Sequence, residues 1–157
     1  GVQVATLLDS AGIDGIVASA GTSSFNPMLM VRGDSLAPGL IAQEQNPVTR
    51  LAIRLLAPLL FQRYPFSELY LMEHAKRVQA AVKCPVIYIG GCTSRNDAQS
   101  VVNAGFSFIQ LGRSLLQDPD FVAHAMNDSH YVNGCTHCNL CMSLIEQPEG
   151  IRCVLND

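Results

Sequence analysis

The sequence has few charged residues and no large basic cluster. Asp, Glu, Lys and Arg make up only 15% of its 157 residues, and the formal net charge is −3. The largest basic group is the pair Lys76-Arg77, so the sequence gives no general basis for nucleic-acid binding. Because 48% of the residues are hydrophobic, the composition argues against disorder and predicts a folded domain with a buried core.

Segments that would anchor or export the protein are also lacking. No stretch of about 18 uncharged apolar residues is present, so no membrane span is predicted. The most apolar run, 51–61, is interrupted by Arg54 and Pro58. The N-terminal stretch GVQVATLLDSAGIDG has no basic region and does not resemble a signal peptide. We therefore expect a cytoplasmic protein, and the absence of an initial Met suggests a processed form or a fragment.

Several common catalytic motifs are missing as well. The sequence contains no Walker phosphate loop, no GxSxG nucleophile motif and no GxGxxG dinucleotide motif. It also presents no obvious pair of acid and base residues. No residue is therefore assigned a catalytic role from the sequence.

The sequence is organised around a predicted βαβ unit, PVIYIGGCTSRNDAQSVVNAGFSFIQLGR (85–113). Its first strand, 85–89, is rich in β-branched and aromatic residues. Ser94 is a suitable N-cap for the helix that follows, and Gly105 lies where such a helix ends. The second strand, 106–111, is again almost continuously apolar. Apolar strands of this kind are typical of a parallel sheet that is buried on both faces.

Both predicted strands end in glycine. Gly90 and Gly91 follow the first strand, and Gly112 and Arg113 follow the second. Glycine lets peptide N–H groups approach an anion closely, and a guanidinium can bind phosphate through two hydrogen bonds. Phosphate sites in (β/α)8 barrels usually lie on the loops after strands 7 and 8. The sequence therefore predicts a phosphate-bearing cofactor at these four residues, and the alternative is ordinary turn chemistry with a surface arginine.

The rest of the chain predicts one further strand and several helices. The expected order gives three parallel strands, whereas a complete (β/α)8 barrel needs eight and about 250 residues. We therefore predict an α/β fold that is a partial TIM barrel over residues 1–126, followed by a cysteine-rich tail over 127–157. The expected helices are 2–11, 46–59, 66–82 and 118–126, and the expected strand is 13–19. A long loop, which could contain a short helix, spans 27–48. Hydroxyls at 22–24 could contact a substrate or flavin, or could only form a turn.

Four of the six cysteines follow the pattern Cys135-x2-Cys138-x2-Cys141-x11-Cys153. Three thiolates at this spacing can hold one face of a cuboidal iron–sulfur cluster, and a remote fourth thiolate can complete it. Structural zinc is an alternative, although its ligands more often come as two separated CxxC pairs. Reduced cysteines that only pack a loop are the third interpretation. The remaining two, Cys84 and Cys92, are interpreted as small packing residues.

Four stretches carry a family resemblance: GIDGIVASAG, PVIYIGG, FSFIQLGRSLLQDPDFV and CTHCNLCM. Together they resemble the old yellow enzyme family of NADH:flavin oxidoreductases, particularly the branch with the 2,4-dienoyl-CoA reductases. The resemblance implies an FMN-binding (β/α)8 barrel in which this chain supplies strands 6, 7 and 8. It also implies that Gly90, Gly91, Gly112 and Arg113 hold the FMN phosphate.

The resemblance implies a function for the complete enzyme. Hydride would pass from NAD(P)H to FMN, and then to an activated alkene or similar acceptor. The family draws most flavin contacts and its proton-donating residues from the early half of the barrel, so the chain by itself is expected to be inactive. The tail resembles that of members with a 4Fe-4S cluster, which usually have one more residue between the second and third cysteine. The alternative is a non-catalytic half-barrel, or metal-binding scaffold, that pairs with another chain at its open sheet edges.

Overall fold

The computed structural model describes residues 1–21 and 29–156. It divides into two compact units, which are described separately. The first, called the sheet unit, comprises residues 1–20 and 67–133, and the second, called the helical unit, comprises residues 21–66 and 134–157. No helix among the described residues has both the length and the apolar character that crossing a membrane requires.

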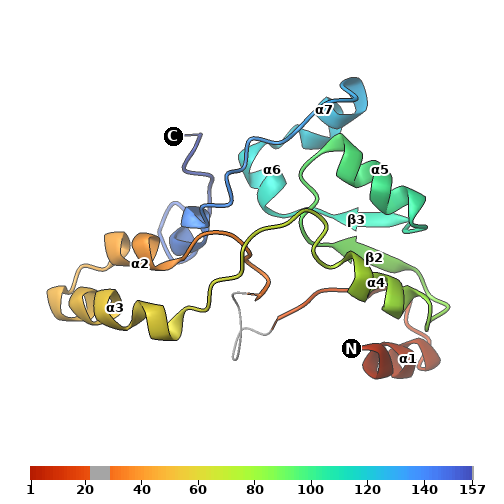
Figure 1. Ribbon diagram of the computed structural model, residues 1–157, viewed down its shortest axis with the longest axis horizontal. Helices are drawn as coiled ribbons and strands as arrows, with labels where there is room; N and C mark the ends of the chain where they lie inside the picture. The colour runs from red at the N-terminus through yellow and green to blue at the C-terminus, as the bar shows by residue number, and fades with distance from the viewer. Residues whose placement is uncertain (22–28, 157) are drawn as a thin grey trace. The chain divides into compact units, whose positions relative to one another are not determined.

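The sheet unit contains a three-stranded sheet in the order β1-β2-β3, and both strand pairs are parallel. The strands are β1 (Ile16–Val17), β2 (Val86–Ile89) and β3 (Phe108–Gln110). Helix α5 (Arg95–Asn103) connects β2 to β3, as Figure 1 shows. The predicted α/β class, with three parallel strands and a central βαβ unit, is therefore confirmed.

Local signals place α5 where the sequence predicted it. Ser94 is the N-cap residue, and its hydroxyl oxygen accepts a hydrogen bond of 3.0 Å from the Asp97 amide. Gly105 follows the helix with a positive φ of +88°, a conformation that favours glycine. The other helices of the sheet unit are α1 (Val2–Ser10), α4 (Met72–Gln79), α6 (Arg113–Gln117) and α7 (Phe121–Asn127).

The main core of the sheet unit lies on one face of β2. Val86 and Tyr88 are alternate, buried residues of this strand, so they share a face. They belong to one buried cluster with Ala75 of α4 and Val101 of α5. Helices α4 and α5 therefore cover the same face of the sheet.

The strands are shorter and more exposed than the sequence suggested. β1 has two residues, whereas the predicted strand was 13–19, and β3 has three, whereas the prediction was 106–111. Burial on both faces is wrong for β3, since the Phe108 side chain is 57% exposed. The physical reason is the strand order, which leaves β1 and β3 as edge strands among the described residues.

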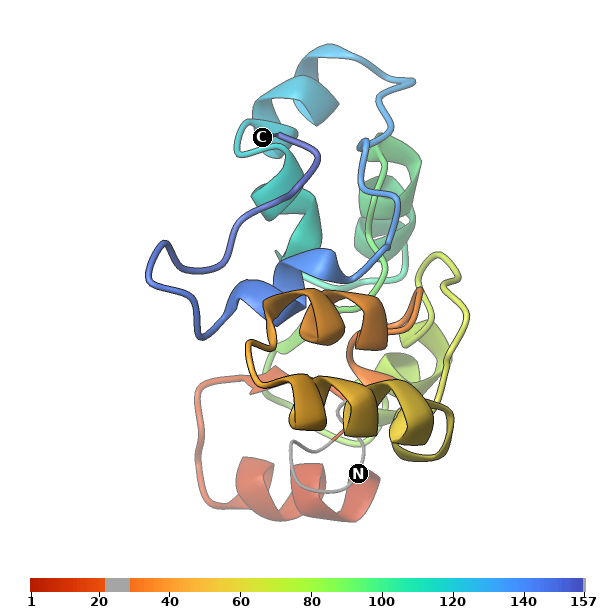
Figure 2. The ribbon, with the colours of Figure 1, turned by 90° about the vertical axis from the view of Figure 1, so that its left-hand side faces the viewer.

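The helical unit is built on a helix pair. Helix α2 (Ala37–Gln43) lies beside α3 (Pro47–Leu60), and the 3-10 helix η2 (Leu140–Leu144) contacts α2 (Figure 2). The Asn46 side chain caps α3 by accepting hydrogen bonds from the amides of Val48 and Thr49. Pro58 lies inside α3, which continues for two more residues.

Within the helical unit, residues 137–139 of the cysteine-rich tail contact residues 31–34. Gly33 has a φ of +140°, and a Cβ there would clash with the His137 carbonyl oxygen. The Asp34 amide donates a hydrogen bond of 2.9 Å to the same carbonyl. The buried Asn139 side chain donates to the carbonyls of Val31 and Asp34, each at 2.8 Å. These contacts fix residues 137–139 against residues 31–34.

Candidate functional site

The loops that follow β2 and β3 lie at the same end of the sheet, where the carboxyl ends of the strands meet. This is a consequence of the parallel pairing, which places the carboxyl ends of both strands side by side. A direct hydrogen bond joins the loop after β2 to the first turn of α6, because the buried Ser114 hydroxyl donates to the Cys92 carbonyl at 2.8 Å. The structure thus brings together the two segments that carry the predicted phosphate-binding residues. Phosphate binding itself stays a prediction.

Gly90 and Gly91 meet a packing requirement that the sequence did not reveal. Their φ angles are +119° and +73°. A Cβ on Gly91 would lie 2.9 Å from the Leu69 amide nitrogen and from the Ser67 carbonyl oxygen. The Leu69 amide also donates to the Gly91 carbonyl at 3.1 Å. Close contact with the turn before α4 therefore accounts for these two glycines without any ligand.

Gly112 is in a different environment. It is exposed, and a Cβ built on it would meet no atom within 4 Å. Arg113, the first residue of α6, is half-buried. Gly112 leaves room for an anion, and the neighbouring residue in the chain, Arg113, carries a positive charge. These two residues therefore fit the predicted phosphate ligand better than the first glycine pair does.

The loop after β2 is held by a buried carboxylate. Asp97 is 5% exposed, and its Oδ2 accepts hydrogen bonds from the Thr93 amide at 2.9 Å and the Thr93 hydroxyl at 3.1 Å. The Asp97 amide in turn donates to the Ser94 hydroxyl oxygen. These reciprocal bonds combine a helix cap with a rigid loop, and they fix the backbone directly after Gly91 and Cys92.

A third segment, residues 131–133, also contributes to this end of the sheet, and the sequence analysis did not identify it. The Asn133 amide donates to the Thr93 carbonyl at 2.8 Å, and the Arg95 amide donates to the Tyr131 carbonyl at 3.0 Å. The segment therefore runs against the loop after β2 in an antiparallel sense. It has no periodic pattern that would have predicted this pairing.

A polar cluster lies beside this segment. Asp118 Oδ2 accepts hydrogen bonds from the Tyr131 hydroxyl and from His124 Nδ1, the latter at 2.7 Å. The Tyr131 and His124 bonds hold the pKa of the Asp118 carboxyl below its ordinary value. The bond to Asp118 raises the pKa of His124, and burial raises the pKa of Tyr131. The cluster thus favours an ionised Asp118 beside a protonated His124.

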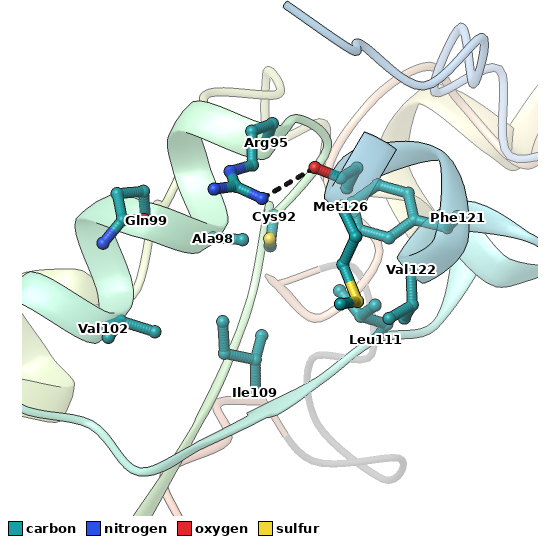
Figure 3. Close-up of a pocket in the computed structure, with 11 residues that line it drawn as sticks. Cys92, Arg95, Ala98, Gln99, Val102, Ile109, Leu111, Phe121, Val122 and Met126 are labelled. Carbon is teal, nitrogen blue, oxygen red and sulfur yellow. Dashed lines mark hydrogen bonds between the residues drawn. The ribbon is translucent and has the colours of Figure 1, made fainter. Parts of the chain in front are cut away.

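An apolar cavity of about 300 Å³ lies between α5, β3 and α7 of the sheet unit (Figure 3). The Cys92 thiol is buried in its wall, and burial raises the pKa of this thiol to about 12. Arg95 lies at one side and donates to the Ala125 carbonyl at 2.9 Å. The four predicted phosphate-binding residues do not line this cavity. Cys92 is accordingly a protonated packing residue, as its place after a strand suggested.

The predicted metal ligands lie in the helical unit. Cys135, Cys138 and Cys153 are half-buried, and Cys141 is buried. Within residues 1–21 and 29–156, no three Cys, His, Asp or Glu side chains come together as a metal site. In this arrangement the four thiols do not come together as a ligand set. Metal binding by these cysteines stays a prediction. The predicted hydroxyl contacts at 22–24 lie outside the described residues.

Comparison with known proteins places the chain near reductases. No protein-family model matches it, and no solved structure does. It is 30% identical over 157 residues to 4,4'-dithiodibutanoate disulfide reductase of Rhodococcus erythropolis, covering 99% of this chain and 38% of that enzyme. Bilirubin reductase of Mediterraneibacter gnavus is 30% identical over 90 residues, which are 55% of this chain and 14% of the relative. These relatives are reductases.

A third relative is the NADH:acrylate oxidoreductase of Vibrio harveyi, which is 32% identical over 50 residues, 32% of this chain and 5% of that protein. The chain therefore spans well under half the length of the curated relatives that it matches. All three names agree with the oxidoreductase class that the sequence resemblance implied.

Proposed function

We propose that this chain is the phosphate-binding portion of an FMN-dependent oxidoreductase. The observation that carries the proposal is the meeting of two strand-end loops at one end of the sheet, with open space at Gly112 beside Arg113. Similarity to reductases over the length of the chain supports the oxidoreductase class. The resemblance to the old yellow enzyme family suggests FMN as the flavin.

The architecture favours a partial (β/α)8 barrel rather than an open, doubly wound sheet. Both α4 and α5 pack on the face of β2 that carries Val86 and Tyr88. A doubly wound sheet has helices on both faces, whereas a barrel has them only outside. In the proposed complete protein, β1, β2 and β3 are strands 6, 7 and 8, and further strands pair at the two edges.

In this proposal FMN supplies the redox chemistry, which is hydride transfer from NAD(P)H to an activated alkene or similar acceptor. The residues of this chain bind and orient the phosphate end of the cofactor. Arg113 supplies the positive charge and hydrogen bonds, and Gly112 leaves room for the phosphate to approach. The loop that carries Gly90 and Gly91 forms the opposite side of the site. No described residue is assigned the transfer of a proton.

The proposal predicts that Arg113 recognises the FMN phosphate. Arg113→Ala should weaken FMN binding by roughly 10- to 100-fold, because a charged hydrogen bond contributes about 1.5–3 kcal/mol. Riboflavin, which has no phosphate, should bind the variant and the original chain equally. Flavin fluorescence titration measures both affinities, and Arg77→Ala, an exposed arginine on α4, is the control. Equal loss of both flavins, or no preference for FMN in the original chain, would contradict the proposal.

A second candidate is a non-catalytic half-barrel that binds another chain through its sheet edge. The observation in its favour is the exposure of Phe108 on the edge strand β3, since unpaired strand edges bind other strands readily. Analytical ultracentrifugation separates the candidates. Association that Phe108→Lys abolishes, without flavin binding, favours this candidate. A flavin-binding monomer argues against it.

A further inference from the structure

A side-chain network connects the 131–133 segment to the first turn of α6. The Asn133 side chain is 7% exposed, and its Nδ2 donates to the Ser114 carbonyl at 3.1 Å and to the Tyr131 hydroxyl at 3.4 Å. The Ser114 hydroxyl donates to the Cys92 carbonyl. The Asn133 side chain and the Ser114 hydroxyl together join three segments that are distant in the sequence: the loop after β2, the start of α6 and residues 131–133.

The same segment also holds the other end of α6. The Tyr131 hydroxyl donates to Asp118, which is the C-cap residue of this helix. The Tyr131 ring packs edge-on against the buried Phe121 ring, with centroids 5.5 Å apart. Helix α6 has only five residues, and a helix that short is not stable in isolation. Its position therefore depends on these contacts at its two ends.

The backbone arrangement makes Asn133 difficult to replace. The Ser114 carbonyl already accepts the Asp118 amide at 2.9 Å within α6, and its second lone pair accepts from Asn133. The Asn133 amide meanwhile donates to the Thr93 carbonyl. A side chain at 133 without an N–H donor would leave the buried Ser114 carbonyl with one bond and would release the first turn of α6.

We propose that Asn133 is a positioning residue for the phosphate site. Its side-chain amide binds the first turn of α6, and its backbone amide binds the loop after β2. Together they fix Gly112 and Arg113 against that loop. The inference rests on the proposed function, because Arg113 is the group that it places. Tyr131 serves the same role from the far end of α6. Neither residue contacts the phosphate.

The test compares two flavins that differ only in the phosphate. Asn133→Asp keeps the shape of the side chain but replaces the donor by an oxygen, and Tyr131→Phe removes the hydroxyl while keeping the ring. The exposed Asn103 of α5 provides the control variant Asn103→Asp. Dissociation constants for FMN and for riboflavin are measured on each purified chain, and thermal unfolding reports whether each chain is folded.

Positioning predicts that Asn133→Asp weakens FMN binding by about tenfold or more while riboflavin binding stays unchanged. Tyr131→Phe should show the same pattern, and Asn103→Asp should match the original chain. Equal loss of both flavins in the Asn133 and Tyr131 variants, or no loss of either, would overturn the positioning role and leave the proposed function intact. An original chain that does not prefer FMN to riboflavin would overturn the proposed function and this inference together. If Asn133→Asp fails to fold, the Tyr131→Phe result decides.

Discussion

At the scale of single residues, Gly91 and Gly112 look alike in sequence but differ in what surrounds them. Both follow an apolar strand, and both were predicted to admit an anion. Gly91 has a positive φ and contacts the backbone of the turn before α4, whereas Gly112 has open space around it. A glycine that is required by packing therefore cannot be separated, from sequence alone, from one that leaves room for a ligand.

The close contact at Gly91 predicts that adding one methyl group at this position strongly destabilises the folded chain. Gly91→Ala should lower the free energy of unfolding by about 3 kcal/mol or more, because a left-handed residue costs about 1–2 kcal/mol and the backbone clash adds to it. Gly12→Ala is the matched control, since Gly12 has a φ of +84° with no atom within 4 Å. It should show the conformational cost alone. Urea denaturation measures both, and equal losses would mean that the clash at Gly91 relaxes freely.

At the scale of elements, helices form where local signals specify them. The Asn46 cap of α3 and the Ser94 cap of α5 are made by side chains close to the helix that they begin. The apolar side of α3 is nevertheless exposed, and the Leu59 side chain is 82% exposed. Capping therefore matters more for α3 than it would for a helix that packing holds in place.

The cap of α3 can be tested at one position. The Asn46 Oδ1 accepts hydrogen bonds from the Val48 amide at 2.9 Å and the Thr49 amide at 3.4 Å. Asn46→Ala should reduce the stability of α3 by about 1 kcal/mol, and Asn46→Asp should restore it, because Asp caps as well as Asn. Hydrogen exchange of the amides in the first turn of α3 reports the change. Unchanged protection in the alanine variant would show that other contacts hold this end.

At the scale of the whole molecule, the sheet has two open edges among the residues that the structure describes, and the curated relatives are much longer. The Rhodococcus reductase aligns with this chain over only 38% of its own length. In the proposed barrel, most contacts to the flavin ring come from strands that are not part of this chain. The phosphate site and the redox centre would then belong to different portions of one barrel.

This division predicts the behaviour of the chain by itself. The purified 157-residue chain, supplied with FMN, NADH and an activated alkene, should show no turnover above free FMN. The physical reason is that phosphate binding without groups to orient the flavin ring and donate a proton does not lower the barrier. Oxidation of NADH followed at 340 nm under anaerobic conditions measures it, with a complete ene-reductase as positive control. Alkene reduction by the chain would contradict the prediction.

The sequence by itself determined the elements whose signals are local. Ser94 and Gly105 mark the start and the end of α5, and the apolar runs predicted β2 and β3. The parallel βαβ order followed from the spacing of these elements. It could not fix the lengths of β1 and β3, because strand ends depend on neighbouring strands. Only the tertiary structure showed that residues 67–71 occupy the space beside Gly91, and that Asn133 reaches Ser114. Those contacts join segments far apart in the chain, and no periodicity or cap encodes them.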